Sequence, residues 1–145
     1  MPGWVTSGYA EFAKRMPREC QLQLVEIQAP AKNRALPVAK RMAAEARALN
    51  DKLPARVVKV ALDERGKPWT STELAAQLQQ WMASGRDIAL FIGGADGLDA
   101  QFKSEADLLW SLSPLTLPHA LVRVVVAEQL YRAWTILNNH PYHRE

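Results

Sequence analysis

Four side chains near the end of the chain, His140, Tyr142, His143 and Arg144, have the chemistry to act on a nucleic-acid base. An imidazole can accept a proton, a phenol can stack on a base and a guanidinium can bind phosphate. A frayed terminus without function is the alternative, because the last residues of a domain are often poorly ordered. The two hypotheses differ in whether the folded chain holds these side chains in place.

A glycine-rich turn, Gly93-Gly94-x-x-Gly97, follows a short apolar segment. Glycine lets the backbone approach a ligand closely and adopt positive φ angles without steric cost. The spacing is neither G-x-G-x-x-G nor a P-loop, so it supports neither dinucleotide binding nor P-loop phosphate binding. A ligand-binding turn and a plain tight turn both remain open.

A second loop, from Leu112 to Pro118, interleaves apolar residues with hydroxyl groups and prolines. This composition suits a rigid loop that wraps a partly apolar ligand and offers it main-chain hydrogen bonds. The alternative is a buried connection that caps the following helix through Thr116. The residues alone do not decide between the two.

No metal site is predicted from the histidines and the cysteine. His119, His140 and His143 lack the H-E-x-x-H spacing, and the single cysteine, Cys20, provides no thiolate pair. No Gly-x-Ser-x-Gly motif is present for a serine nucleophile. We interpret Cys20 as a small buried residue that opens a strand.

Hydrophobic periodicity predicts helices and strands in alternation. Helices are expected at 4–16, 36–50, 97–106 and 118–138 and after a capping box that begins at Thr70, with strands at 20–28, 57–62, 88–92 and 108–112. The last helix is the least obvious, because Val122 to Val126 favours a strand, but no helix breaker occurs before Asn138.

This order of elements predicts an α/β fold with a mostly parallel sheet and helices on both faces. Three loops follow strands, at 63–68, 93–97 and 112–118. Parallel sheets bind ligands beyond the carboxyl ends of their strands, so we expect these loops to gather at that edge.

Size and composition indicate one domain over residues 1–145, with 48% hydrophobic and 23% charged residues. No apolar run reaches the roughly 20 residues that cross a bilayer, and the first residues lack the apolar region of a signal peptide. We therefore expect a cytoplasmic protein that binds no membrane.

Positive charge is concentrated in the first part of the chain. Residues 1–60 hold 11 Lys/Arg and 5 Asp/Glu (net +6), whereas residues 61–145 hold 7 and 10 (net −3). Such a basic half favours a polyanionic partner such as RNA, although an ordinary solvated face explains it too.

Four stretches of the sequence carry a resemblance to a known family. They are Ile92-Gly93-Gly94-x-x-Gly97-Leu98, Leu112-Ser113-x-Leu115-Thr116-Leu117-Pro118-His119, Glu128-Gln129-Leu130-Tyr131-Arg132-Ala133-Trp134 and Asn139-His140-Pro141-Tyr142-His143-Arg144-Glu145. The chain resembles the ribosomal large-subunit pseudouridine N3-methyltransferases of the SPOUT, or α/β-knot, superfamily. The likeness extends from Met1-Pro2-x-Trp4-Val5 through Gly66-Lys67-Pro68-Trp69 to the end.

The resemblance implies a single SPOUT methyltransferase domain that uses S-adenosylmethionine to methylate N3 of a pseudouridine in large-subunit (23S) ribosomal RNA. It implies that the donor is held in a C-terminal trefoil knot and that the protein is a homodimer. By analogy, the donor-binding residues are Leu62, Gly93, Gly94, Leu112, Ser113, Pro114, Leu115, Thr116 and Leu117. The tail of Tyr142, His143 and Arg144 matches the part of the family that faces the substrate, and these are the expected catalytic residues.

The chain departs from the family pattern at its start. Members normally open with a short apolar strand and a glycine-containing turn before the Met-Pro-x-Trp segment, and here Met1 begins at that segment. We therefore expect a sheet without the usual first strand. A non-catalytic RNA-binding or ribosome-associated module of the same fold is the alternative function, since such a loss could remove activity.

The last helix is the expected dimer interface. Leu130, Tyr131 and Trp134 give it more apolar surface than one face of a lone domain requires, and a symmetric partner could bury the surplus.

Overall fold

A three-stranded parallel sheet lies at the centre of the protein. The computed structural model describes residues 2–27, 35–54, 56–93 and 97–143. Strand β1 (Val58–Lys67) lies between β2 (Ile88–Phe91) and β3 (Leu108–Trp110), and both pairings are parallel. The predicted parallel sheet is therefore confirmed.

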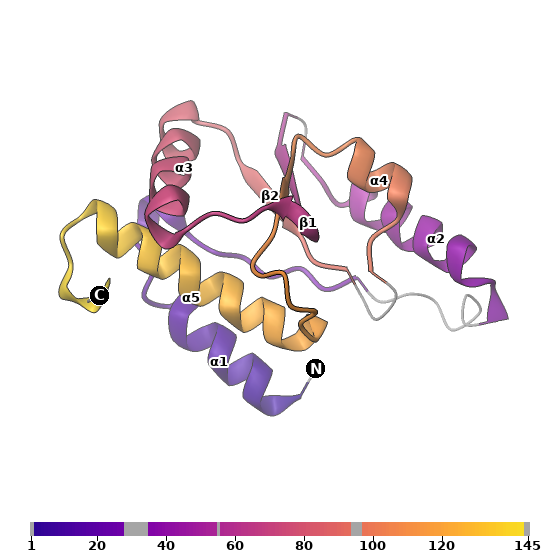
Figure 1. Ribbon diagram of the computed structural model, residues 1–145, viewed down its shortest axis with the longest axis horizontal. Coiled ribbons are helices and arrows are strands. Elements are labelled where there is room, and N and C mark those ends of the chain that lie inside the picture. Colours follow the sequence, from indigo (N-terminus) through magenta and orange to yellow (C-terminus); the bar gives the residue numbers. More distant parts are fainter. Residues whose placement is uncertain (1, 28–34, 55, 94–96, 144–145) are drawn as a thin grey trace.

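Helices cover both faces of this sheet (Figure 1). One face carries α1 (Gly3–Ala13), α3 (Ser71–Ser84) and α5 (His119–Leu137), and the other carries α2 (Val38–Asp51) and α4 (Ala100–Ser104). Two short 3-10 helices, η1 (Arg18–Cys20) and η3 (Pro141–His143), complete the described elements. None of the helices in the described part of the chain is both long and apolar enough to cross a membrane.

Neighbouring residues of β1 contribute to two separate hydrophobic cores, one on each face of the sheet. Val60 is fully buried and belongs to the cluster formed with α3 and α5, whereas Ala61, also fully buried, belongs to the cluster formed with Phe91 and Phe102. Neighbouring side chains of a strand point to opposite faces, so the apolar run of β1 supplies both cores at once. This is why a continuous apolar sequence, without alternation, specifies the central strand.

Local sequence signals set the bounds of α3. The Thr70 hydroxyl accepts a hydrogen bond from the amide of Glu73, and the Glu73 carboxylate accepts one from the amide of Thr70. This capping box satisfies two of the amides that a helix start leaves unpaired. Gly85 ends the helix with a left-handed φ of 69°.

Helix α5 forms despite the strand propensity of its valines. Val126, Ala127 and Leu130 are buried against the rest of the chain, so tertiary packing decides the conformation. On α1, a Cβ added to Gly8 would lie 3.2 Å from Val124 of α5, so the two helices pack closely there.

Three tryptophans pack where α3 and α5 meet the sheet. The rings of Trp69 and Trp110 have centroids 5.8 Å apart, and those of Trp69 and Trp81 are 6.1 Å apart with an edge-on orientation. Trp81 and Trp110 belong to the buried core.

The predicted strand at 20–28 is wrong for the residues that the structure describes. Cys20 is the last residue of η1, and residues 21–27 form no strand. Burial raises the pKa of the Cys20 thiol, and the charge of the neighbouring Glu19 raises it further. Extended backbone becomes a strand only by pairing with a neighbour, and residues 21–27 pair with none of the three described strands. Leu24 and Val25, within the predicted strand, are exposed.

Two helices are shorter than the periodicity indicated. The first ends at Ala13, although Met16 beyond it is buried, and α4 covers only Ala100–Ser104 of the predicted 97–106. Apolar spacing continued past both helix ends, so the pattern overestimated their length.

We predict that Gly66→Ala destabilises the fold strongly. Gly66 lies against the backbone of β3, where an added Cβ would be 2.5 Å from the carbonyl carbon of Leu109. Backbone cannot move aside cheaply, so we expect the free energy of unfolding to fall by about 2 kcal/mol or more in urea titration. Gly3→Ala is the matched control, because a Cβ there meets no atom within 4 Å and should leave stability unchanged. Equal stability of the two variants would contradict the close approach.

Candidate active site

Contacts join the last residues of β1 to α4 and to the loop after β3 at the carboxyl edge of the sheet. Asp63, at the end of the regular part of β1, pairs with Lys103 of α4 at 3.2 Å. Its neighbour Glu64 accepts a hydrogen bond of 3.2 Å from the Thr116 hydroxyl in the loop after β3. Residues 63–67, which were expected to form a loop, belong to β1 in the structure. Their contacts join the end of β1 to α4 and to the loop after β3, as expected for that edge of the sheet.

The glycine turn after β2 brings two backbone segments into contact. A Cβ on Gly93 would lie 2.6 Å from the carbonyl carbon of Gly97, so only glycine fits at position 93. Gly97 has a φ of 82°, and a Cβ there would meet no atom within 4 Å. Gly94 lies outside the described residues. The turn is therefore tight, and it leaves open space beside Gly97.

The loop after β3 is organised by its serines. The buried Ser111 hydroxyl donates to the carbonyl oxygen of Ser113, and the Ser113 hydroxyl accepts a hydrogen bond of 3.0 Å from the amide of Leu115. Leu115 is thereby held 72% exposed at the tip. Such a loop presents an apolar side chain from a fixed backbone.

Thr116 does not cap the last helix, so that alternative is wrong. Its hydroxyl donates to Glu64, and α5 begins after Pro118 with no side-chain cap. Pro118 and the tip residues Pro114 to Thr116 are exposed. The loop is therefore a surface feature and not a buried connection.

The residues expected to bind the donor lie together in part. Leu62 in β1 and Leu112 and Leu117 in the loop after β3 are half-buried. Leu62 pairs with Trp110, the last residue of β3. The edge thus combines half-buried leucines, main-chain groups and a glycine turn, which fits a partly apolar ligand with polar edges.

A left-handed residue folds the tail back onto the end of α5. Asn139 has a φ of 54°, and the amide of His140 donates to the carbonyl oxygen of Thr135 at 2.9 Å. This is the six-residue hydrogen bond of a Schellman motif, and asparagine is one of the few side chains that tolerates its left-handed position. The tail is held in place as far as His143, and Arg144 lies outside the described residues.

Tyr142 packs against its own chain. Its ring centroid lies 4.8 Å from that of Tyr131, and the Arg132 guanidinium lies 5.1 Å from it on the ring face. Burial raises the pKa of the Tyr142 phenol, and the charge of Glu128 raises it further. The phenol therefore stays protonated near neutral pH.

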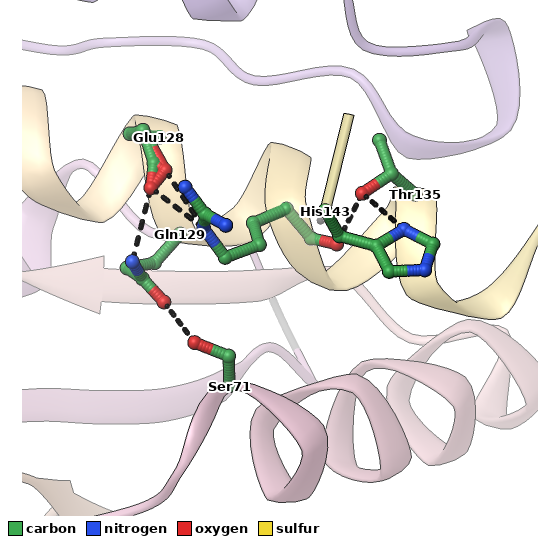
Figure 2. A network of polar contacts seen from close by, with 6 residues as sticks. Ser71, Glu128, Gln129, Thr135 and His143 are labelled. Atoms are coloured by element: carbon green, nitrogen blue, oxygen red, sulfur yellow. Dashed lines mark hydrogen bonds and ion pairs between the residues drawn. The ribbon is translucent and has the colours of Figure 1, made fainter. Parts of the chain in front are cut away.

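His143 is hydrogen bonded to the last turn of α5. Its Nδ1 lies 3.2 Å from the hydroxyl oxygen of Thr135, whose side chain is fully buried (Figure 2). The sequence reading did not include Thr135. A hydroxyl residue in the last turn of a helix, just before a tail that is expected to be catalytic, is the signal that could have identified it.

A line of polar contacts runs along α5 toward this point (Figure 2). Ser71, the first residue of α3, donates to Gln129 at 2.8 Å, and Gln129 donates to Glu128 at 3.0 Å. Glu128 in turn pairs with Arg132 at 3.0 Å. The spacing of Glu128 and Arg132, four residues apart on a helix, was a signal for this pair.

Helix α5 separates the loops from the tail. It has 19 residues, which at 1.5 Å per residue place its two ends about 28 Å apart. The loop after β3 leads into its first residue, and the tail follows its last. The loop after β3 therefore lies at the start of α5, whereas the tail folds back against its second half, with Tyr142 on Tyr131 and His143 on Thr135. Within the described ranges, no group of three or more His, Cys, Asp or Glu side chains is arranged to hold a metal ion.

Comparison with known proteins identifies the family. A family model described as "Predicted SPOUT methyltransferase" matches residues 1–143. The chain belongs to the SPOUT methyltransferase family.

Several curated SPOUT relatives resemble the chain over nearly its full length, and each is named ribosomal RNA large subunit methyltransferase H. The protein of Paraburkholderia xenovorans is 54% identical over 144 residues, 99% of this chain and 92% of the relative. That of Laribacter hongkongensis is 54% identical over 145 residues, 100% of this chain and 93% of the relative. That of Hydrogenovibrio crunogenus is 49% identical over the same length and the same shares.

The apolar surface expected for a dimer of this SPOUT protein needs correction. Leu130 and Tyr131 are 4% and 5% exposed, because they pack into the core of their own chain. Trp134 is only half-buried, as are Leu121 and Val125 on the same helix. The apolar surface that α5 leaves exposed therefore comes from half-buried side chains such as Trp134, and not from Leu130 or Tyr131.

We predict that Asn139→Val releases the tail from α5. A β-branched residue is strained at positive φ, so the bond from His140 to Thr135 should open more often. We expect hydrogen exchange of the His140 amide to accelerate on the order of tenfold. Asn139→Gly is the control, because glycine adopts the left-handed conformation readily and should preserve protection. Unchanged exchange in the valine variant would mean that other contacts hold the tail.

Proposed function

We propose that the protein transfers a methyl group from S-adenosylmethionine to N3 of a pseudouridine in large-subunit ribosomal RNA. The observation that carries the proposal is identity of about one half, over nearly the whole chain, to SPOUT relatives named for methylation of that RNA. The aligned length includes the three edge loops and the tail. The basic first half of the chain supports a polyanionic substrate, and the ribosome places the activity in the cytoplasm.

In this proposal the edge loops bind the donor. Leu62, Gly93 and Gly94 would bind it together with the loop residues Leu112, Ser113, Pro114, Leu115, Thr116 and Leu117. The space beside Gly97 and the half-buried leucines suit an adenosyl group, which has apolar faces and a polar edge. We further propose that this region forms the C-terminal trefoil knot of the superfamily. The match to the SPOUT family model supports this part of the proposal.

The tail acts on the RNA. When bound, S-adenosylmethionine supplies an electrophilic methyl group, so the chain must position N3 and accept the proton that N3 loses. Tyr142 keeps its own proton because its pKa is raised, so it serves as an aromatic surface and hydrogen-bond donor. His143 is the proton acceptor, and Arg144 binds phosphate.

Each site is completed by a second copy of the chain. His143 contacts Thr135, which lies 16 positions after the first residue of α5. At 1.5 Å per residue this places the imidazole about 24 Å along the helix from the loop after β3, too far for direct transfer within one chain. A symmetric homodimer brings the tail of one copy to the loops of the other, and two such sites form together. The half-exposed apolar residues of α5 and the exposed Leu115 are suited to the interface.

Donor binding separates this enzyme from a non-catalytic RNA-binding module of the same fold. In isothermal titration we expect the wild-type protein to bind S-adenosylmethionine and Gly93→Ala to bind it at least about tenfold more weakly, because the new Cβ displaces the backbone at Gly97. Gly85→Ala is the control. Gly85 has a left-handed φ, and an added Cβ there meets no atom within 4 Å. The substitution should therefore cost about 1 kcal/mol of stability through backbone strain alone, without changing affinity for the donor. Absence of donor binding by the wild type would favour the module.

Mixed dimers test whether the site is shared. We expect sedimentation of a species with twice the chain mass of 16.2 kDa, and loss of RNA methylation in both Gly93→Ala and His143→Ala. Mixing the two variants under exchange conditions should restore about one quarter of wild-type activity, since half of the dimers are mixed and each has one intact site. A mixture as inactive as its components would show that one chain supplies both loops and tail.

A further inference from the structure

The hydroxyl of Thr135 has its single proton already engaged. It donates to the carbonyl oxygen of Arg132 at 2.6 Å, the bond that a threonine in a helix makes to the preceding turn. A hydroxyl has one proton and two lone pairs. Toward His143 the Thr135 oxygen can therefore act only as an acceptor.

This fixes the proton on the imidazole of His143. Nδ1 lies 3.2 Å from the Thr135 oxygen, so Nδ1 must carry hydrogen and donate it. A neutral imidazole has one N–H, and the other nitrogen is then an acceptor. Nε2 consequently presents a lone pair. Within residues 2–27, 35–54, 56–93 and 97–143 no hydrogen bond involves Nε2, and Figure 2 shows this side of the ring turned away from Thr135.

The same residue also holds the backbone that carries the ring. The carbonyl oxygen of Thr135 accepts the amide of His140, so its main chain fixes the tail and its side chain fixes the imidazole. His140 is held in the opposite tautomer, because its Nδ1 accepts the amide of Tyr142 at 3.2 Å. The packing of Tyr142 against Tyr131 and Arg132 closes the turn.

Burying the Thr135 hydroxyl costs free energy of folding unless the hydroxyl finds hydrogen-bond partners. Its side chain is fully buried, and a valine would fill the same volume without a polar group to satisfy. The structure supplies two partners for the hydroxyl, one in the helix and one in the tail. An apolar residue would lose both bonds, but the carbonyl oxygen of Arg132 could keep its main-chain bond within the helix, whereas Nδ1 of His143 would lose its contact with residue 135.

We propose that Thr135 is a positioning residue that holds His143 as the Nδ1–H tautomer and so presents Nε2 as the base for methyl transfer. This deepens the proposed function and rests on it. As the N3 lone pair of the uracil ring forms the bond to the methyl carbon, the S–CH3 bond of the sulfonium donor breaks and its electron pair stays on sulfur. The N3 proton passes to Nε2 of His143, which becomes an imidazolium with Nδ1–H still bonded to Thr135.

Nitrogen NMR of the wild-type dimer tests the tautomer without any assay of activity. Long-range 1H–15N correlation spectra in alkaline buffer, assigned with His143→Gln, should show a protonated Nδ1 and an unprotonated Nε2 at His143. His140 should show the reverse pattern. A His143 signal with hydrogen on Nε2 would overturn the proposal whatever the enzyme's activity.

Variants at Thr135 test the effect on the reaction. In Thr135→Val we expect His143 to lose its Nδ1–H signature and the methylation kcat to fall about 10- to 100-fold, part of what a general base contributes, with donor Kd and the KM for RNA nearly unchanged. Thr135→Ser should restore both the signature and most of the rate. Thr72→Val is the control, since Thr72 is exposed on α3 and makes the same chemical change far from the tail.

The outcomes separate the two proposals. A wild-type protein that transfers no methyl group would refute the proposed function, while the NMR result would still decide the tautomer. A Thr135→Val variant that methylates at the wild-type rate would refute the role of Thr135 alone. If that variant unfolds, the serine variant and the wild-type spectrum remain decisive, because neither removes the hydroxyl.

Discussion

The register of β1 is the constraint on which the rest of the structure depends. Val60 pairs with Leu90 on one side and with Leu108 on the other, so one strand sets the positions of both neighbours. A shift of this pairing by one residue would turn the side chains of each face to the opposite face, where they would meet helices with which they do not pack. The same register determines where β1 ends, and Asp63 and Glu64 contact the other edge loops from that end. Fold and candidate site thus depend on the same pairing.

Helix α5 links the two halves of the proposed site and keeps them apart. It is packed along its length by α1 and α3, with Ala127 and Ala133 fully buried, so it behaves as a rigid spacer. This rigidity has two consequences for the proposed site. A rigid helix prevents a chain from bringing its own tail to its own loops. It also fixes the geometry of the tail well enough for the hydrogen bond to Thr135 to determine the tautomer of His143. A composite site between copies satisfies both conditions.

Features encoded locally in the sequence were predictable. The capping box at Thr70 and the apolar runs at 57–62 and 88–92 identified α3, β1 and β2, although β1 continues to Lys67 through residues expected to form a turn. The strand expected at 20–28 failed because a strand depends on a partner, which its own residues cannot reveal. Leu130 and Tyr131 were read as surplus surface because periodicity does not show how many neighbours a helix has, and α5 is packed against both α1 and α3.

The site divides in the same way. The tail and the edge loops could be found from residue types and position after strands, and the family resemblance assigned their roles. The contact of Thr135 with His143 could not be read from the sequence, because it requires the left-handed turn at Asn139 to reverse the chain. Capping of the last helix by Thr116 was one of two alternatives, and its hydroxyl instead donates to Glu64, which is 52 positions away. Side chains with several possible partners choose among them by three-dimensional proximity.

The tryptophan cluster gives the protein a built-in optical reporter. Trp69 follows the loop after the regular part of β1, and Trp110 directly precedes the loop after β3. The two indoles are 5.8 Å apart, within range of electronic coupling between rings, and Trp81 lies against the first of them. A shift of either loop changes the environment of this group. Intrinsic fluorescence and near-ultraviolet circular dichroism therefore follow events at the carboxyl edge without a label.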